Sequence, residues 1–195
     1  MDVDRGMGEK KQFNALAFGI VYFLMFAVAF AMNKDGKMIL YPEVGPGFFY
    51  TLLMDTLIGI GVGLVVVLLS QWLTVKSKAM QDLSAELYAI VGEMHLQDVF
   101  FLACFFSIGE EFLFRGIVQG HFGLLLASIL FGVLHSAPGQ KGRIWSLFAM
   151  IMGLVLGAEY LWRKNIFTPI WTHFIVNFFN VYLLQNKMKK TTPGS

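Results

Sequence analysis

Long apolar stretches dominate this chain and restrict what it can fold into. Of its 195 residues, 56% are hydrophobic and only 14% are charged, whereas a soluble domain carries about 25% charged residues. A membrane-spanning helix needs about 20 predominantly apolar residues. Six stretches approach or exceed that length, at residues 13–32, 48–73, 99–115, 122–137, 144–162 and 169–184. The sequence therefore predicts an all-α, multi-pass membrane helix bundle with about six transmembrane helices.

The segment between the second and third stretches is too polar to span a bilayer. Residues 74–98 carry apolar side chains at helical spacing, with acidic side chains off that stripe. This pattern favours an amphipathic helix on the membrane surface; a solvated connector with incidental periodicity is the alternative. We accordingly expect an N-terminal region at 1–98, a core at 99–184 and a basic C-terminal tail at 185–195.

Lys and Arg residues are distributed unevenly over the short loops. With the N-terminus inside, the inner segments hold ten of them and the outer loops hold four. The inner ones are Arg5, Lys10, Lys11, Lys76, Lys78, Lys141, Arg143, Lys187, Lys189 and Lys190, and the outer ones are Lys34, Lys37, Arg163 and Lys164. Because cytoplasmic loops carry the excess, we expect a plasma (inner) membrane protein with both termini in the cytoplasm. A net charge of +2 without a basic stripe gives no reason to expect nucleic acid as a partner.

Polar and ionisable residues interrupt three of the last four apolar stretches. They are Glu110, Glu111, Arg115, His135, His173 and Asn177. Such groups are costly at membrane depth and usually mark a functional site. Hydrolysis needs a general base, an imidazole and a donor for the oxyanion, and these residue types are all present.

The two adjacent glutamates cannot have the same role. On a helix they point about 100° apart. Glu111 precedes Arg115 by four residues, which is the favourable order for an ion pair, so we expect it to be structural. Glu110 is then free to face the bundle interior, where partial desolvation would make it a better general base. The alternative is that the whole cluster is a salt bridge at a helix end.

The remaining polar residues allow two interpretations. His173 and Asn177 are four residues apart on one helix face, and both can donate hydrogen bonds to a developing oxyanion. The alternative is that they and His135 only bridge helices. Asp55 is a weaker functional candidate, and Glu159 is expected at an interfacial position.

A turn between the third and fourth helices is expected at residues 116–121. At about 1.5 Å per residue, this turn places Glu110 within about 10 Å of the membrane face where the third helix ends, and His135 about 20 Å from that face. The fourth helix must start deeper, or the third must run lower, for the two groups to meet. In the second helix, Gly59 and Gly63 are spaced to let another helix approach closely.

The polar motifs, in this order, resemble the CAAX-protease and bacteriocin-processing family of intramembrane proteases, also called CPBP or Abi. The matching stretches are GEEFLFRG at 109–116, FGVLH at 131–135 and HFIVN at 173–177. The resemblance covers residues from about 99 to 184. It implies an α-helical membrane fold with a cavity among the motif-bearing helices, and hydrolysis of a peptide bond.

The resemblance also implies roles for the site residues. Glu110 and His135 would activate water, His173 and Asn177 would hold the oxyanion, and the glutamate–arginine ion pair would brace the site. The implied substrate is a membrane protein, a lipid-linked peptide or a C-terminal tail. The charge count places the Glu110 end of the third helix and the His173 end of the sixth toward the outside, whereas prenyl-tail enzymes of this family are reached from the cytosol. If both statements hold, this chain is not a prenyl-tail protease, and an outward site would suit cleavage of the C-terminal anchor of an exported protein.

Zinc is a possible cofactor. Glu110, His135 and His173 could supply three protein ligands and leave a position open for water. Asn177 on the face of His173 favours an oxyanion pair instead. With Glu111 held by its arginine, no second carboxylate is left to orient a ligating histidine. We therefore expect no cofactor.

Two other classes of function fit the same composition. One is a non-catalytic bacteriocin-immunity or peptide-binding membrane protein. The presence of all the polar residues that hydrolysis would need argues against this class. The other is a small proton- or metal-coupled transporter that uses the acidic and histidine residues as a relay. Six helices without a visible internal repeat disfavour the transporter.

Overall fold

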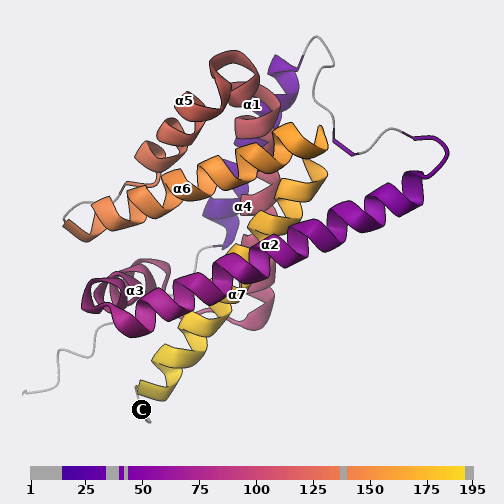
Figure 1. Cartoon of the computed structure of the whole chain (residues 1–195). Helices are drawn as coiled ribbons and strands as arrows, with labels where there is room; N and C mark the ends of the chain where they lie inside the picture. Colours follow the sequence, from indigo (N-terminus) through magenta and orange to yellow (C-terminus); the bar gives the residue numbers. More distant parts are fainter. Residues whose placement is uncertain (1–14, 34–39, 42–43, 137–139, 192–195) are drawn as a thin grey trace, which may run out of the picture.

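The computed structural model describes residues 15–33, 40–41, 44–136 and 140–191, and within them the chain is helical with no β-strand (Figure 1). The helices are α1 (Ala15–Met32), α2 (Phe48–Lys76), α3 (Lys78–Val91), α4 (Leu96–Leu113), the π-helix η1 (Phe114–Val118), α5 (Gln119–Leu134), α6 (Gln140–Arg163) and α7 (Phe167–Thr191). The all-α prediction is confirmed, and each of the six apolar stretches is largely helical.

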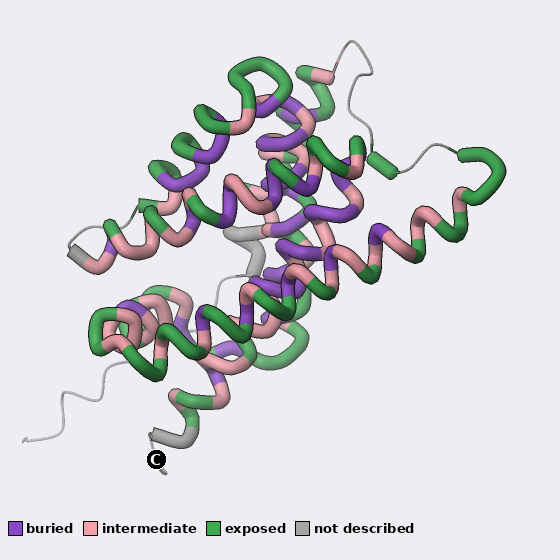
Figure 2. Tube along the Cα trace, in the orientation of Figure 1, coloured by how far each residue is buried: buried purple, intermediate pink, exposed green. Residues whose placement is uncertain are grey.

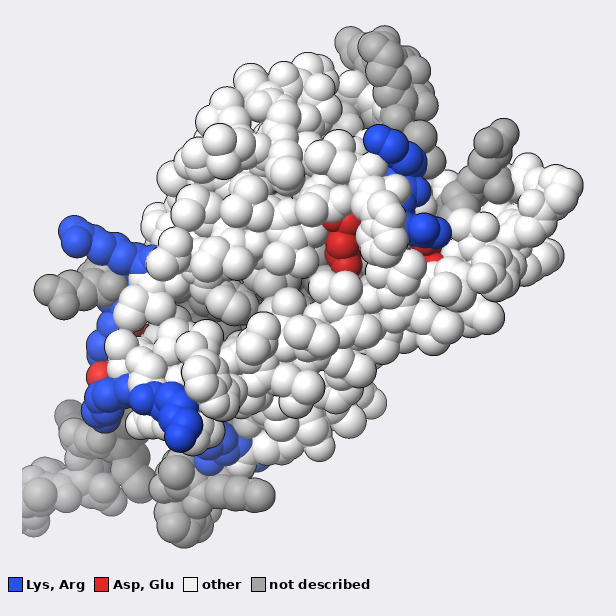
Figure 3. Space-filling model, viewed as in Figure 1, with Lys and Arg blue, Asp and Glu red and all other residues white. Residues whose placement is uncertain are grey.

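Among the described residues, three helical segments are long and apolar enough to cross a membrane. They are α2, the continuous run Leu96–Leu134, and Lys141–Arg163 within α6, while Gly19–Met32 of α1 is a shorter apolar helix. Large apolar side chains such as Phe49, Leu68 and Leu125 are more than 60% exposed. On the face shown in Figure 3, Lys and Arg lie at two ends with a mostly uncharged surface between them. This distribution fits a protein whose apolar flanks face lipid.

The helices pack around a centre formed by α4, α6 and α7. Helix α4 packs against α1 and α7, α2 packs against α7, and α5 packs against α6. Buried residues gather in this centre (Figure 2). Its apolar core includes Val67 of α2, Leu156 of α6 and Val176 of α7. The centre is therefore built mainly from the motif-bearing part of the chain, with α2 lying across it.

Two glycines let α2 and α7 come into close contact. A Cβ atom on Gly59 would lie 2.6 Å from the Cβ of Trp171, and one on Gly63 would lie 2.7 Å from the Cβ of Ile175. Distances this short are not tolerated, so a side chain at either position would push the helices apart. The prediction of close packing at this pair of glycines is confirmed.

The expected turn at residues 116–121 is wrong. Helix α4 continues through η1 into α5, and the break comes at Gly123, which has φ 76° and ψ 171°. Glycine adopts this left-handed φ without steric cost. The helix continues past residue 116 because Gln119 is buried and donates its side-chain N–H to the Gly157 carbonyl of α6. A tertiary contact therefore overrides the local turn signal.

The shifted turn brings the two polar motifs to the same level. Glu110 precedes Gly123 by thirteen residues, and His135 follows it by twelve. At about 1.5 Å per residue, each lies about 20 Å from the turn. The depth mismatch expected from the sequence therefore does not exist.

The predicted amphipathic segment contains helix α3, and helix α7 extends into the predicted C-terminal tail. Helix α3 is joined to α6 by Lys141, whose Nζ lies 2.9 Å from Glu86 Oε1. Helix α7 runs to Thr191 rather than ending at residue 184. It continues because Gln185 is buried and hydrogen-bonds the backbone of Gly92 and Met94. The boundary expected at residue 185 is thus not the end of a helix.

Candidate active site

Three helices bring a carboxylate and two imidazoles together. Glu110 lies in the last turn of α4, His135 caps the end of α5, and His173 lies in the second turn of α7. The Oε2 atom of Glu110 is 3.6 Å from His135 Nε2 and 3.7 Å from His173 Nε2. The Glu110 and His173 side chains are buried, and that of His135 is 22% exposed. The geometry thus places the predicted base and both predicted histidines in one cluster.

The two oxygens of the Glu110 carboxylate have different surroundings. Oε1 accepts a hydrogen bond of 3.0 Å from the hydroxyl of Tyr22 on α1. Oε2 is buried and has no hydrogen-bond partner among the described residues. Oε2 is therefore the oxygen available to a reacting molecule.

His135 is held in one tautomer by the end of its own helix. Its Nδ1 lies 2.8 Å from the carbonyl oxygen of Phe131. A carbonyl only accepts hydrogen bonds, so the proton is on Nδ1. In the neutral ring, Nε2 is then an acceptor that faces Glu110. The imidazole is thus placed to receive a proton from the carboxyl group.

Glu111 has two partners, one expected and one not. The expected ion pair is present, with Arg115 Nε 2.8 Å from Glu111 Oε2 and both side chains fully buried. The other oxygen, Oε1, lies 2.9 Å from His173 Nδ1. The expectation that no carboxylate remains to orient a histidine is therefore wrong, because one carboxylate serves both groups.

Arg115 connects the site to α6. Its Nη1 donates to the Gly153 carbonyl oxygen at 3.1 Å and to Gln119 Oε1 at 3.4 Å. The guanidinium also lies over the ring of Phe131, 5.6 Å from its centroid. These contacts engage Nε and Nη1 of the buried guanidinium and fix the α4 end that carries both glutamates, whereas Nη2 has no hydrogen-bond partner among the described residues.

Asn177 lies one helical turn beyond His173, on the same face of α7. Its Nδ2 is buried and has no hydrogen-bond partner in the described part of the chain. A buried amide N–H without a hydrogen-bond partner destabilises the fold, unless a bound ligand accepts its hydrogen bond. This donor is therefore free for a bound ligand.

Two acidic residues outside the cluster have structural partners. Asp55 is fully buried, and its carboxylate accepts hydrogen bonds from Arg163 and Asn165, which joins α2 to the turn before α7. Glu159 was expected at an interface, and that expectation is wrong. It is buried because α6 turns this face toward α7, where the hydroxyl of Thr172 donates to it at 2.8 Å.

The sequence did not reveal Tyr22 or the second partner of Glu111. Tyr22 and Glu110 are 88 residues apart, and His173 and Glu111 are 62 apart. No helical periodicity relates residues so distant in sequence. The one available signal for Tyr22 is its hydroxyl, a polar group inside an apolar stretch.

The described residues contain no group of three or more His, Cys, Asp or Glu side chains placed to hold a metal ion. The donor types of Glu110, His135 and His173 would still suit zinc. Each histidine has its Nδ1 on an oxygen acceptor, which is the support that ligating histidines normally have. These three residues would hold such an ion, and it would polarise a bound water.

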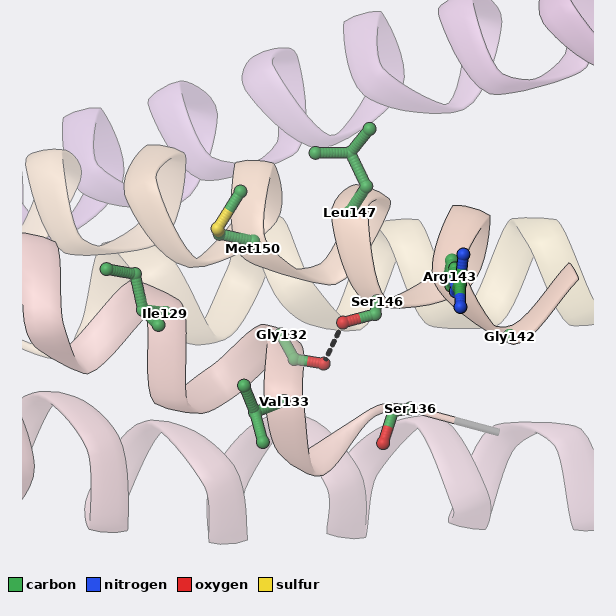
Figure 4. A pocket seen from close by; sticks show the side chains of 9 residues that line it. All are labelled: Ile129, Gly132, Val133, Ser136, Gly142, Arg143, Ser146, Leu147 and Met150. Carbon is green, nitrogen blue, oxygen red and sulfur yellow. Dashed lines mark hydrogen bonds between the residues drawn. The ribbon is translucent and has the colours of Figure 1, made fainter. Parts of the chain in front are cut away.

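A pocket of about 280 Å³ lies between α5 and α6 (Figure 4). Its walls are mainly apolar, with Ile129 and Val133 from α5 and Leu147 and Met150 from α6. None of the residues of the polar cluster lines it. The pocket is therefore separate from the candidate active site.

Fold and site together define an all-α membrane protein with a buried glutamate–histidine cluster where three helices meet. Residues 93–179 match the model of a protein family described as type II CAAX prenyl endopeptidase Rce1-like. The matched segment contains all six predicted site residues, and this family lies within the CPBP group that the motifs resemble. The resemblance seen in the sequence motifs is confirmed.

A similar protein is known from Bacillus subtilis (strain 168), the uncharacterized protein YpbD. It is 37% identical over 90 residues, which cover 45% of this chain and 46% of that protein. The chain thus spans about half the length of the curated relative it matches. No solved structure matches the chain.

Proposed function

We propose that this protein is an intramembrane endopeptidase that hydrolyses a peptide bond in a membrane-associated or lipid-linked peptide, using water activated by Glu110. The observation that carries this proposal is the state of Glu110 Oε2, which is buried, has no hydrogen-bond partner among the described residues and is faced by two imidazoles. A general base must have a free acceptor atom within reach of the water proton. The family of residues 93–179 supports peptide-bond hydrolysis.

The residues can be arranged into a balanced reaction. Glu110 Oε2 takes a proton from water as the water oxygen bonds to the substrate carbonyl carbon, giving a tetrahedral oxyanion. Asn177 Nδ2 donates a hydrogen bond to that oxyanion. The C–N bond then breaks, and the leaving nitrogen takes the proton from Glu110, directly or through His135 Nε2.

The contact with Glu111 changes the role expected for His173. Its Nδ1–H is donated to Glu111 Oε1 at 2.9 Å. Since one proton is already used there, Nε2 can donate to an oxyanion only when the ring is an imidazolium. A fully buried carboxylate at hydrogen-bond distance holds the ring in one orientation. In this proposal Glu111 is a positioning residue for His173 as well as a partner of Arg115.

The proposed reaction is metal-free, and this part of the proposal has its own test. Purified enzyme in lipid nanodiscs is expected to keep its activity after exhaustive treatment with a strong chelator. Loss of activity that returns on adding stoichiometric zinc would reverse this assignment. Circular dichroism before and after chelation separates loss of a catalytic ion from loss of the fold.

The substrate class follows from the matched family and from the depth of the site. The family description names a CAAX prenyl endopeptidase, and the motif resemblance implies a C-terminal tail as substrate. The sequence favoured an outward site because the charge count placed the Glu110 and His173 helix ends outside and the turn after Glu110 was expected at residues 116–121. With the turn at Gly123, His135 lies at the opposite end of α5, which is cytoplasmic in the expected orientation. We therefore propose a lipid-linked or membrane-anchored C-terminal tail presented from the cytoplasmic side.

A comparison of protein termini tests the activity even while the substrate is unidentified. Membranes from cells producing the wild type, Glu110→Gln or Glu86→Gln are analysed by mass spectrometry for new peptide ends. Glu86 lies on α3 with a half-exposed side chain, so the same change there is a matched control. We expect ends that occur with the wild type and with Glu86→Gln but not with Glu110→Gln. Identical ends in all three samples would contradict the proposal.

A further inference from the structure

The N-terminal helix reaches the candidate active site through one residue. Tyr22 of α1 donates its hydroxyl to Glu110 Oε1 at 3.0 Å. Residue 22 lies far outside the segment 93–179 that matches the protease family. The contact is therefore a feature of this chain that the family match does not cover.

The surroundings of Tyr22 are shaped to hold its ring in place. The ring stacks on Phe106 of α4, with centroids 4.1 Å apart and planes inclined by 27°. One turn further along α4, a Cβ atom on Gly109 would lie 3.0 Å from Tyr22 Cδ1. The absence of a side chain at Gly109 thus leaves the space that the ring occupies. Ring and hydroxyl are both positioned by the same stretch of α4 that carries the base.

The hydrogen bond distinguishes the two carboxylate oxygens of Glu110. With Oε1 engaged by the phenol, the carboxylate cannot rotate freely, and Oε2 stays directed at His135 and His173. Without the phenol, either oxygen could face the imidazoles or leave them. Buried side chains that make such bonds fix a reactive group in its productive orientation.

We propose that Tyr22 is a positioning residue that selects Oε2 of Glu110 as the proton-accepting oxygen, which makes α1 part of the active site. This inference rests on the proposed function, since it assigns a role in the same reaction. Tyr22 acts through Glu110, so its loss should affect turnover rather than substrate binding. A purely structural tyrosine would instead contribute to packing and stability.

Removing the hydroxyl alone tests the proposal. Tyr22→Phe keeps the ring on Phe106 and beside Gly109. A hydrogen bond to a charged group contributes enough that its loss corresponds to a change of about 10- to 100-fold. We expect kcat to fall by about that factor with KM nearly unchanged. The probe is an internally quenched peptide that copies the cleaved sequence found in the comparison of termini, with protein in nanodiscs.

Two further variants separate positioning from packing. Phe26→Leu weakens a neighbouring contact between α1 and α4, where the Phe26 and Phe112 rings are 4.9 Å apart, and it is expected to leave kcat unchanged. Gly109→Ala displaces the Tyr22 ring and should lower kcat. Combining Gly109→Ala with Tyr22→Phe should lower kcat little beyond the worse single change, because both act on one hydrogen bond.

The outcomes distinguish this inference from the function on which it rests. Full turnover by Tyr22→Phe together with inactive Glu110→Gln would overturn the role of Tyr22 and leave the protease intact. Equal losses in Tyr22→Phe and Phe26→Leu, with matching losses of thermal stability, would reduce Tyr22 to a packing residue. Full activity of Glu110→Gln would overturn the proposed function and this inference with it.

Discussion

Glu111 shows what a sequence can and cannot reveal about a single residue. Its ion pair with Arg115 follows from helical spacing alone, and the structure contains it at 2.8 Å. Its contact with His173 joins residues 62 positions apart and depends on how α4 and α7 pack. Local pairs can be predicted because one helix determines their distance, whereas pairs between helices cannot.

The buried ion pair leads to a prediction about stability. Removing one partner of such a pair leaves an uncompensated buried charge and costs about 3–5 kcal/mol. We expect Glu111→Ala and Arg115→Ala each to lose stability on this scale. The double variant should be no worse than the worse single variant, since the two residues are coupled.

Thermal unfolding of the purified variants in nanodiscs measures these effects. Glu111→Ala should also be less active per folded molecule, because His173 loses its partner. Losses that simply add in the double variant would show that the two residues act independently. If Arg115→Ala is as stable as the wild type, the ion pair between Arg115 and Glu111 does not stabilise the fold.

At the level of helices, the sequence located the elements better than the turns between them. The apolar stretches predicted the helices because their composition is nearly uniform. The turn after α4 was misplaced because Gly116 and Gly120 resemble a break as much as Gly123 does. Burial of Gln119 against Gly157 decides among these glycines, and that contact has no local signature in the sequence.

The contact between α2 and α7 can be tested with three glycines in one helix. Gly59 and Gly63 face α7, whereas a Cβ atom on Gly61 would meet nothing within 4 Å. Gly59→Ala and Gly63→Ala should each destabilise the fold by about 1–3 kcal/mol through overpacking. Gly61→Ala should be neutral or slightly stabilising, because alanine favours the helix.

Unfolding of the three variants under identical conditions gives the comparison. The control at Gly61 has the same chemistry and the same helix, so only the neighbouring helix differs. If all three variants have the same stability, α2 and α7 do not approach as closely as described.

At the level of the whole molecule, the class of fold was predictable and its arrangement was not. Composition and stretch length indicate a membrane helix bundle. Which helices touch depends on contacts such as Gly59 with Trp171 and Tyr22 with Glu110. The charge distribution predicts both termini in the cytoplasm, and this orientation determines the side from which the site is reached.

Cysteine labelling in intact cells tests the orientation. Phe122, just before the break at Gly123, and Ser136, just after the end of α5, are both exposed and lie near opposite ends of this helix. In a Cys104→Ser background, an impermeant thiol reagent should label Phe122→Cys and not Ser136→Cys. Labelling of Ser136→Cys alone would invert the orientation and open the site to the outside.

The role of Glu110 as the base is the central claim, and turnover by purified Glu110→Gln tests it most directly. The change keeps the shape of the side chain and removes the basic oxygen. With the internally quenched peptide as substrate, kcat is predicted to fall by about 10²–10⁴-fold, with helicity and thermal stability unchanged. Turnover near that of the wild type, by protein free of wild-type contamination, would contradict the account.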